Sequence, residues 1–185
     1  MAHVSSFLAR AGLVALALSI AGAVGPVFAA SGGSSGGGGA STTPTCQSGY
    51  VYDANKKTCV KATSGLIDDK QLYAQGRALA LDGRYAEALD ALTAVRNQND
   101  SMVLTMIGYA KRKSGSFDEG MAYYQRALAI DPKNVNTREY LGEAYAEKGR
   151  MDLAKAELTK VEALCGTECE QYQDLAKAIA GQSDE

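Results

Sequence analysis

Apolar side chains recur at every third or fourth position between residues 66 and 164, which is the spacing of amphipathic helices. The clearest example spans residues 104–128, where two short runs each place their apolar side chains on one helical face. The first run is Leu104, Ile107 and Ala110, and the second is Phe117, Met121, Tyr124 and Leu128. A glycine and a polar residue typical of a helix start separate the two runs. The pattern therefore predicts helical hairpins.

The hairpin pattern occurs three times, and small residues set its register. Gly76, Gly108 and Gly142 form one column of the alignment, so the spacing is 32 and then 34 residues. Further columns follow at constant offsets: Gly83, Gly115 and Gly149; Tyr85, Phe117 and Met151; Ala88, Gly120 and Ala154; Leu92, Tyr124 and Leu158; Val95, Ala127 and Val161. Because small side chains let helices approach closely, we expect Gly108 to lie against Gly120 and Ala127.

The middle unit carries the motif Leu104-x-x-Ile107-Gly108, Gly120-x-x-x-Tyr124, Ala127 and Pro132. With its period and its helix-turn-helix content, this motif resembles the tetratricopeptide repeat (TPR) family. The resemblance covers a segment at 66–168, with units at about 69–100, 101–134 and 135–168. It implies an all-α fold, a right-handed α-solenoid of about three TPR helix-turn-helix units.

The first and third units depart from the family pattern at their ends. Residues 96–100 replace the terminal proline of the first unit, and a Cys165-Gly166 corner replaces that of the third. A helix is predicted at 169–181, with these residues on its apolar face: Cys169, Tyr172, Leu175, Ala176 and Ile179. Such a helix would cap the otherwise exposed end of the solenoid, and a short tail at 182–185 follows it.

Polar residues near the predicted helix starts indicate how the helices are capped. Two capping boxes are predicted, Ser116 with Glu119 and Thr167 with Glu170. Asn134 or Asn136 is expected to cap the first helix of the third unit, after Pro132 has ended the preceding helix.

Residues 1–29 match a cleavable secretory signal peptide. They contain no acidic residue, one basic residue at Arg10, an apolar run at 11–24 and the small-residue ending at 27–29. We expect cleavage after this ending and a location across the inner membrane, in the periplasm; an uncleaved N-terminal anchor is the alternative. Residues 30–45 are rich in Gly, Ser and Thr and predict a disordered linker.

The four cysteines fall into two local pairs, and export favours disulfide bonds. Three connectivities are possible, of which the simplest joins Cys46 to Cys59 and Cys165 to Cys169. The first bridge would close a small hairpin in the segment 46–65, and the second would pin a corner between two helices. Paired thiolates at Cys165 and Cys169 are also compatible with thiol redox exchange or a soft metal ion.

Charge and histidine content argue against several classes of function. There are 19 Lys and Arg residues against 21 Asp and Glu, so the formal net charge of −2 gives no general attraction for nucleic acid or an anionic membrane. His3, the sole histidine, lies in the predicted signal peptide, which argues against His-dependent catalysis and metal binding in the mature chain. We therefore expect no enzyme, no cofactor, no metal site, no nucleic-acid partner and no integral membrane segment after signal cleavage.

In the TPR family, the first helix of each unit lines a concave groove that binds an extended or helical peptide. The resemblance assigns these groove residues: Lys70, Tyr73, Arg77, Met102, Thr105, Met106, Tyr109, Arg112, Lys113, Asn136, Glu139, Tyr140, Glu143 and Glu147. They also share one helical face by spacing. Basic residues dominate the first two units and acidic residues the third, so the expected ligand combines an acidic portion, an apolar or aromatic anchor and a basic portion.

These observations favour an exported adaptor or envelope-assembly factor that binds a peptide segment of an unidentified protein partner. Two alternatives stay open. The first is thiol redox or soft-metal handling through Cys165 and Cys169, which reactive cysteines would reveal. The second is binding of an envelope glycan by the Cys46–Cys59 hairpin, with exposed rings at Tyr50 and Tyr52.

Overall fold

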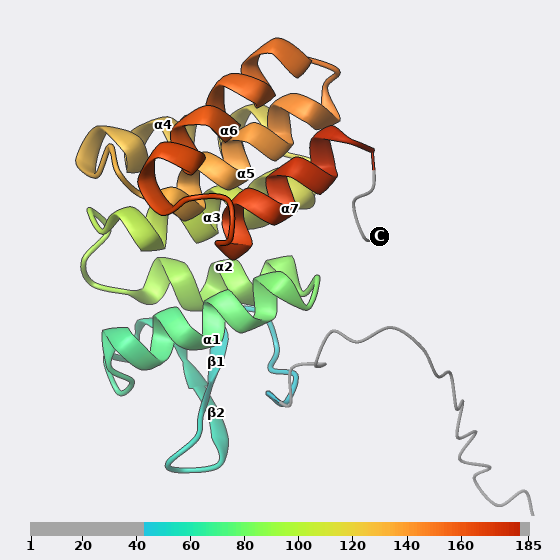
Figure 1. Cartoon of the computed structure of the whole chain (residues 1–185). Coiled ribbons are helices and arrows are strands. Elements are labelled where there is room, and N and C mark those ends of the chain that lie inside the picture. Colours follow the sequence, from blue (N-terminus) through green and yellow to red (C-terminus); the bar gives the residue numbers. More distant parts are fainter. Residues whose placement is uncertain (1–42, 182–185) are drawn as a thin grey trace, which may run out of the picture. The chain divides into compact units, whose positions relative to one another are not determined.

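The computed structural model describes residues 43–181 (Figure 1). The predicted signal peptide, most of the predicted linker and the tail at 182–185 lie outside the described residues. Within residues 43–181, the chain forms two strands, one short 3-10 helix (Ala62–Ser64) and seven α-helices. Of the helices in this range, none combines the length and the apolar character needed to span a bilayer.

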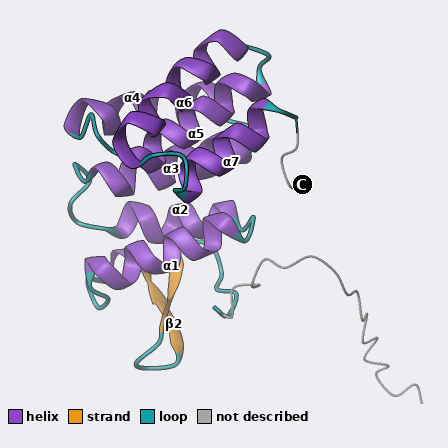
Figure 2. Ribbon diagram, viewed as in Figure 1, coloured by secondary structure: helices purple, strands orange, loops and turns teal. Residues whose placement is uncertain are grey.

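Six of the helices in the described range form three consecutive pairs, and the seventh follows them (Figure 2). The pairs are α1 (Asp69–Leu81) with α2 (Tyr85–Ala94), α3 (Ser101–Lys113) with α4 (Phe117–Ile130), and α5 (Val135–Glu147) with α6 (Met151–Cys165); the seventh helix is α7 (Glu170–Ile179). The two helices of each pair pack together, and α2 and α4 contact the first helix of the next pair. The predicted α-solenoid of three helical hairpins and a capping helix is confirmed.

The first helix of each pair begins at a side-chain cap. Asp68, Asp100 and Asn134 each accept hydrogen bonds from backbone N–H groups two or three positions later. These bonds satisfy amide groups that the first helical turn leaves without partners. Of the two asparagines predicted as caps for α5, Asn134 is the one that caps it.

The second helices begin without a side-chain cap, and both predicted capping boxes are wrong. Ser116 makes no capping hydrogen bond, and its ψ of 61° lies outside the extended region that a capping residue adopts. Gly115, just before it, has a φ of 100°, and this left-handed turn leads from α3 to α4. Helix α7 also starts without a side-chain cap, at Cys169, while the Thr167 hydroxyl donates to Glu168 instead.

Helices α3 and α4 cross where two glycines meet. A Cβ atom added to Gly120 would lie 2.7 Å from the carbonyl oxygen of Gly108 and 2.8 Å from the Cβ of Arg112. A Cβ atom added to Gly108 would lie 2.8 Å from the ring of Tyr124, which is fully buried. The predicted close approach of Gly108 to Gly120 is therefore confirmed, and a side chain at either position would push the helices apart.

Replacing Gly120 by Ala is expected to lower the free energy of unfolding by about 1–2 kcal/mol, because a backbone oxygen cannot move aside for the new methyl group. Urea unfolding measures the change. The exposed Ala122, on the same helix, provides the control. Ala122→Gly isolates helix propensity, which should cost about 1 kcal/mol. A Gly120→Ala variant more stable than wild type would contradict the close approach.

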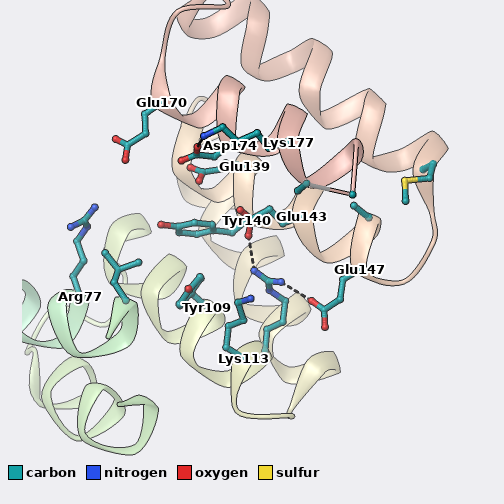
Figure 3. Close-up of a pocket in the computed structure, with 16 residues that line it drawn as sticks. Arg77, Tyr109, Lys113, Glu139, Tyr140, Glu143, Glu147, Glu170, Asp174 and Lys177 are labelled. Carbon is teal, nitrogen blue, oxygen red and sulfur yellow. Dashed lines mark hydrogen bonds and ion pairs between the residues drawn. The ribbon is translucent and has the colours of Figure 1, made fainter. Parts of the chain in front are cut away.

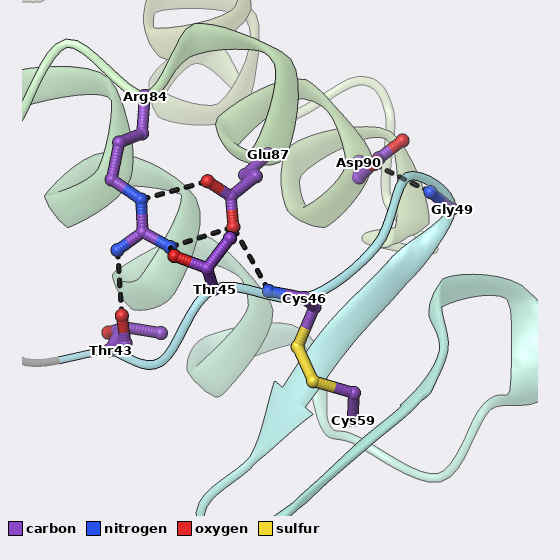
Figure 4. The surroundings of a disulfide bond; sticks show 8 residues. All are labelled: Thr43, Thr45, Cys46, Gly49, Cys59, Arg84, Glu87 and Asp90. Carbon is purple, nitrogen blue, oxygen red and sulfur yellow. Dashed lines mark hydrogen bonds and ion pairs between the residues drawn. A yellow bond between two sulfur atoms is a disulfide. The ribbon is translucent and has the colours of Figure 1, made fainter. Parts of the chain in front are cut away.

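The N-terminal hairpin packs against the first helical pair. Its strands are β1 (Tyr50–Asp53) and β2 (Thr58–Lys61). The strands are antiparallel, with Val51 opposite Val60, and a disulfide joins Cys46 to Cys59 with their Cα atoms 5.8 Å apart (Figure 4). Val51 is only 3% exposed and shares the core of the helices. The hairpin is thus part of the helical unit and covers the start of the solenoid.

Helix α2 and the residue before it bind the chain just ahead of this hairpin through two charged side chains. The backbone N–H of Cys46 donates to the carboxylate of Glu87 at 3.2 Å (Figure 4). Arg84 forms an ion pair with Glu87 at 2.7 Å and donates to the carbonyl oxygen of Thr43 at 2.7 Å. Residues 43–45, which composition assigns to the linker, therefore lie against α2.

Helix α7 packs on α5 and α6 at the other end of the solenoid (Figure 1). Its Leu175 is fully buried, and the leucine methyl groups would lie 2.7 Å from a Cβ atom added to Gly142. A disulfide between Cys165 and Cys169 connects the end of α6 to the residue before α7, with Cα atoms 6.0 Å apart. This arrangement covers the apolar face that the last repeat would otherwise expose.

Candidate functional site

A cavity of about 570 Å³ lies between the first helices of the three pairs and α7 (Figure 3). We call it the groove cavity. Its lining includes Arg77 and Leu81 from α1; Tyr109, Arg112 and Lys113 from α3; Glu139, Tyr140, Glu143, Ala146 and Glu147 from α5; and Glu170, Asp174, Lys177 and Ala178 from α7. Three helical units and the capping helix therefore contribute to one surface.

The fourteen predicted groove residues are divided among three places. Eight of them line the groove cavity: Arg77, Tyr109, Arg112, Lys113, Glu139, Tyr140, Glu143 and Glu147. Lys70, Tyr73 and Met102 line a second hollow of about 370 Å³ at the start of α1 and α3. The remaining three, Thr105, Met106 and Asn136, line neither of these hollows.

Thr105 and Met106 belong to the interior, which corrects their assignment to a binding surface. Thr105 is 0% exposed and Met106 is 2% exposed. The Thr105 hydroxyl shares a hydrogen bond with that of Thr137 on the next helical pair. Asn136 is occupied by the capping helix, because its side-chain oxygen accepts a hydrogen bond from Gln171. These side chains therefore connect neighbouring units.

Arg112 connects two units inside the groove cavity. Its side chain is only 2% exposed, and its guanidinium donates to Glu147 at 2.7 Å and to Glu143 at 2.9 Å (Figure 3). A third bond, at 3.3 Å, runs from its Nε to the hydroxyl of Tyr124 on α4. Since two carboxylates and a hydroxyl already engage its donors, Arg112 is a structural cation rather than one available to a ligand.

Two carboxyl groups in the cavity wall, those of Glu139 and Glu143, have raised pKa values. Burial, together with the nearby carboxylates of Glu143, Asp174 and Glu170, raises the pKa of Glu139 to about 9. Burial also raises the pKa of Glu143 above its ordinary value, although Arg112 opposes this shift. Glu139 is therefore a neutral acid at pH 7 in the free protein.

Two tyrosines form the aromatic part of the wall. The rings of Tyr109 and Tyr140 lie 4.9 Å apart between centroids, tilted by 51°. Burial, together with nearby acidic groups, raises the pKa of Tyr109 to about 12, so its hydroxyl remains protonated at neutral pH. The pair offers both apolar ring surface and hydroxyl groups, which suits recognition of a peptide side chain.

Charges are unevenly distributed around the cavity. Arg77 on α1 and Lys113 on α3 are exposed, and neither forms a hydrogen bond or ion pair through its side chain with any residue in the range 43–181. Carboxyl groups concentrate on the opposite wall, formed by α5 and α7. The predicted separation of basic first units from an acidic third unit therefore applies to the cavity lining as well.

A family model described as a TPR repeat matches residues 108–149, which include α4 and α5. The chain therefore carries a segment that matches a tetratricopeptide repeat. Its helical hairpins are thus a scaffold of the kind that mediates contacts between proteins, and the resemblance predicted from the glycine columns is confirmed.

Known proteins with similar sequence or fold include assembly factors and chaperones. Over 96 residues the chain is 31% identical to the photosystem I assembly protein Ycf3 of Rippkaea orientalis, a match that covers 45% of this chain and 56% of that protein. The matched part thus spans just over half the length of this curated relative.

Two solved structures of the type III secretion translocator chaperone SycD from Yersinia enterocolitica share the fold. One has a TM-score of 0.51 at 20% identity and covers 61% of this chain and 79% of that chain. The other, in complex with a peptide of the translocator YopD, has a TM-score of 0.50 at 19% identity and covers 61% and 87%. At this identity the likeness concerns the helical repeat fold.

The sequence pattern predicted no groove residue on α7, although this helix contributes to the cavity. Glu170, Asp174 and Lys177 line the cavity at spacings of four and three residues, which places them on one face of the helix. The sequence pattern identified the apolar face of α7 as the one that covers the last repeat. The polar face of α7 could have predicted this contribution. A capping helix that packs its apolar face on α5 must direct another face toward the first helices.

The structure also includes the cysteines and the hairpin tyrosines on which the two alternative functions depend. All four cysteines form disulfides, and the described residues contain no group of three or more His, Cys, Asp or Glu side chains positioned to hold a metal ion. Tyr50 and Tyr52, expected to be exposed on the hairpin, are each half-buried. Neither feature presents a formed binding site in the structure.

Proposed function

We propose that this TPR protein is an exported, periplasmic adaptor or envelope-assembly factor that binds a peptide segment of a partner protein in the groove cavity. The observation that carries the proposal is the cavity itself, which collects tilted tyrosines, unpaired basic groups and buried acids from three repeats and the cap. A site assembled from several helices offers an extended ligand several contacts at once. The scaffold favours binding over catalysis.

The similar proteins support this role. SycD has been solved with a peptide of the translocator YopD, and Ycf3 is an assembly protein for photosystem I. Both names describe proteins that act on other proteins. For this chain, the unpaired Arg77 and Lys113 would attract an acidic stretch of the partner, while the tyrosine pair would contact an apolar or aromatic side chain.

Export is supported by the sequence of residues 1–29 and by the cysteines. Both disulfides join residues close in sequence, and such bonds persist in oxidising compartments. A secretory signal at the N-terminus and two local disulfides are thus consistent with a single destination outside the cytoplasm.

Charge reversal at Arg77 and Lys113 is expected to abolish the capture of specific partners. Cross-linking of the full-length protein in its native cells, followed by mass spectrometry, compares wild type with the Arg77→Glu, Lys113→Glu double variant. Both side chains are exposed, so the fold should tolerate the change. We expect at least about a tenfold loss of captured partner, because the basic wall would repel an acidic segment.

The matched control is Lys155→Glu on α6, an exposed charge reversal outside the groove cavity. It should capture the same partners as wild type. Equal capture by all variants would exclude the basic wall from the working surface and contradict the proposal. Circular dichroism of each variant verifies the helical fold, so that loss of capture is assigned to the groove cavity.

A further inference from the structure

Glu139 is a buried acid without a partner. Its side chain lines the groove cavity, the residue is only 6% exposed, and no hydrogen bond or ion pair reaches its carboxyl group from any residue in the range 43–181 (Figure 3). Two other carboxyl groups, on α5 and α6, are paired. Glu157 binds Arg138 at 2.8 Å, and Glu143 binds Arg112. Among residues 43–181, the Tyr73 hydroxyl is the fully enclosed side-chain polar atom without a partner, so the carboxyl oxygens of Glu139 reach the space of the groove cavity, where a ligand could pair with them.

The groups that face Glu139 come from four helices. Glu143 lies on its own helix, α5, and Asp174 and Glu170 lie on α7. Arg77 of α1 and the tyrosines of α3 and α5 complete the set. Asp174 pairs with Lys177 at 3.1 Å, and Glu143 pairs with Arg112, whereas Glu170 is unpaired within the described residues. The immediate surroundings of Glu139 therefore contain more acid than base.

We propose that a Lys or Arg side chain of the bound partner segment enters the groove cavity and forms an ion pair with Glu139. This inference rests on the proposed function, since it specifies which side chain the peptide inserts. The apolar stem of such a side chain would pack on Tyr109 and Tyr140, and its charged end would meet the acidic wall of α5 and α7. A cation is the partner that an unpaired carboxylate binds most strongly.

Formation of the ion pair with Glu139 releases one proton to solvent. With a pKa of about 9, the free protein holds Glu139 as a neutral acid at pH 7. The ion pair requires the carboxylate, so the Glu139 proton passes to solvent as the cation binds, and the positive charge of the partner replaces it. Binding coupled to proton release becomes tighter as the pH rises, here toward about 9, while a lysine of the partner stays charged up to about pH 10.

A phage-displayed library of random dodecapeptides, selected on the full-length protein, provides the test. Peptides recovered by wild type should share a Lys or Arg next to an apolar or aromatic residue. The dissociation constant of a synthetic selected peptide is then measured at about pH 6.5 and about pH 8.5. We expect wild type to bind about tenfold more tightly at the higher pH, and Glu139→Gln, which cannot form a carboxylate, to show no such dependence.

Two control variants separate this inference from the proposed function. Glu162→Gln changes an exposed acid on α6 and should keep the pH dependence of wild type. Peptides that bind Lys113→Glu as well as wild type, or a library that yields no binder, would contradict the proposed function itself. Peptides that require Lys113 but lack a basic residue, or bind Glu139→Gln with unchanged pH dependence, would overturn only the pairing with Glu139.

Discussion

Replacing Arg112 by Met is expected to lower the free energy of unfolding by about 3 kcal/mol at pH 7. The substitution removes the one cation within residues 43–181 that forms an ion pair with Glu143, whose carboxylate lies 2.9 Å from the guanidinium. It also leaves the Tyr124 hydroxyl without its bond to Nε. Methionine fills a similar volume, so the loss reflects stranded polar groups rather than an empty cavity. Urea unfolding measured at constant ionic strength gives the difference.

The deficit should shrink as the pH falls. Burial already holds the pKa of Glu143 above its ordinary value of 4.5, and removing Arg112 takes away the main group that lowers this pKa. When the pKa of an acid is higher in the folded than in the unfolded state, the folded protein loses stability as the pH rises above the unfolded-state pKa. The Arg112→Met variant therefore recovers part of its loss as the pH falls and Glu143 takes up a proton.

The neighbouring Lys113 supplies the control for Arg112. Its side chain is exposed and makes no ion pair within the described residues, so Lys113→Met should change the free energy of unfolding by less than about 0.5 kcal/mol. The two variants remove one positive charge each from adjacent positions. Equal losses would mean that net charge, and not the pairing of Arg112 with Glu143, determines the effect.

The repeat architecture was predictable because its determinants are local and recur. Gly83, Gly115 and Gly149 each have a positive φ at a turn, and the contact of Gly120 with the Gly108 carbonyl oxygen leaves no space for a methyl group. A requirement of this kind allows only one residue type, which makes it visible in the sequence. Helix starts were less predictable, because Ser116 resembles a cap although the preceding Gly115 has already made the turn.

The candidate site was predictable only in part, since helical spacing identifies a face but not its neighbours. Met106 and Tyr109 lie close together on α3, yet Met106 packs inside while Tyr109 lines the groove cavity. The boundary between these two environments depends on how far the next helical pair extends across α3. The acidic groups of α7 were missed for the same reason, because packing of Leu175 over Gly142 determines which side of α7 faces the cavity.

Glu139→Gln is expected to make the protein more stable than wild type by about 2 kcal/mol or more at pH 8. Glutamine has nearly the same shape but carries no ionisable proton. In wild type, the folded state holds this proton up to a pKa of about 9, whereas the unfolded chain releases it near 4.5. Between these values the folded state binds more protons, so the stability of wild type falls as the pH rises through that window.

Urea unfolding at about pH 4, pH 6 and pH 8 follows the difference between the two proteins. At about pH 4 the acid is protonated in both folded and unfolded wild type, so the two stabilities should agree within about 0.5 kcal/mol. The advantage of Glu139→Gln should then grow with pH. Glu162→Gln, at an exposed position, should follow wild type throughout.

A constant difference between Glu139→Gln and wild type across this range would contradict the raised pKa, because it would mean that Glu139 is already ionised in the folded protein. The opposite result has a consequence for binding. If Glu139→Gln is folded and more stable at pH 8, its failure to bind a basic peptide more tightly at high pH cannot arise from unfolding. The stability of the free protein and the pH dependence of peptide binding would then both depend on the proton of one buried carboxyl group.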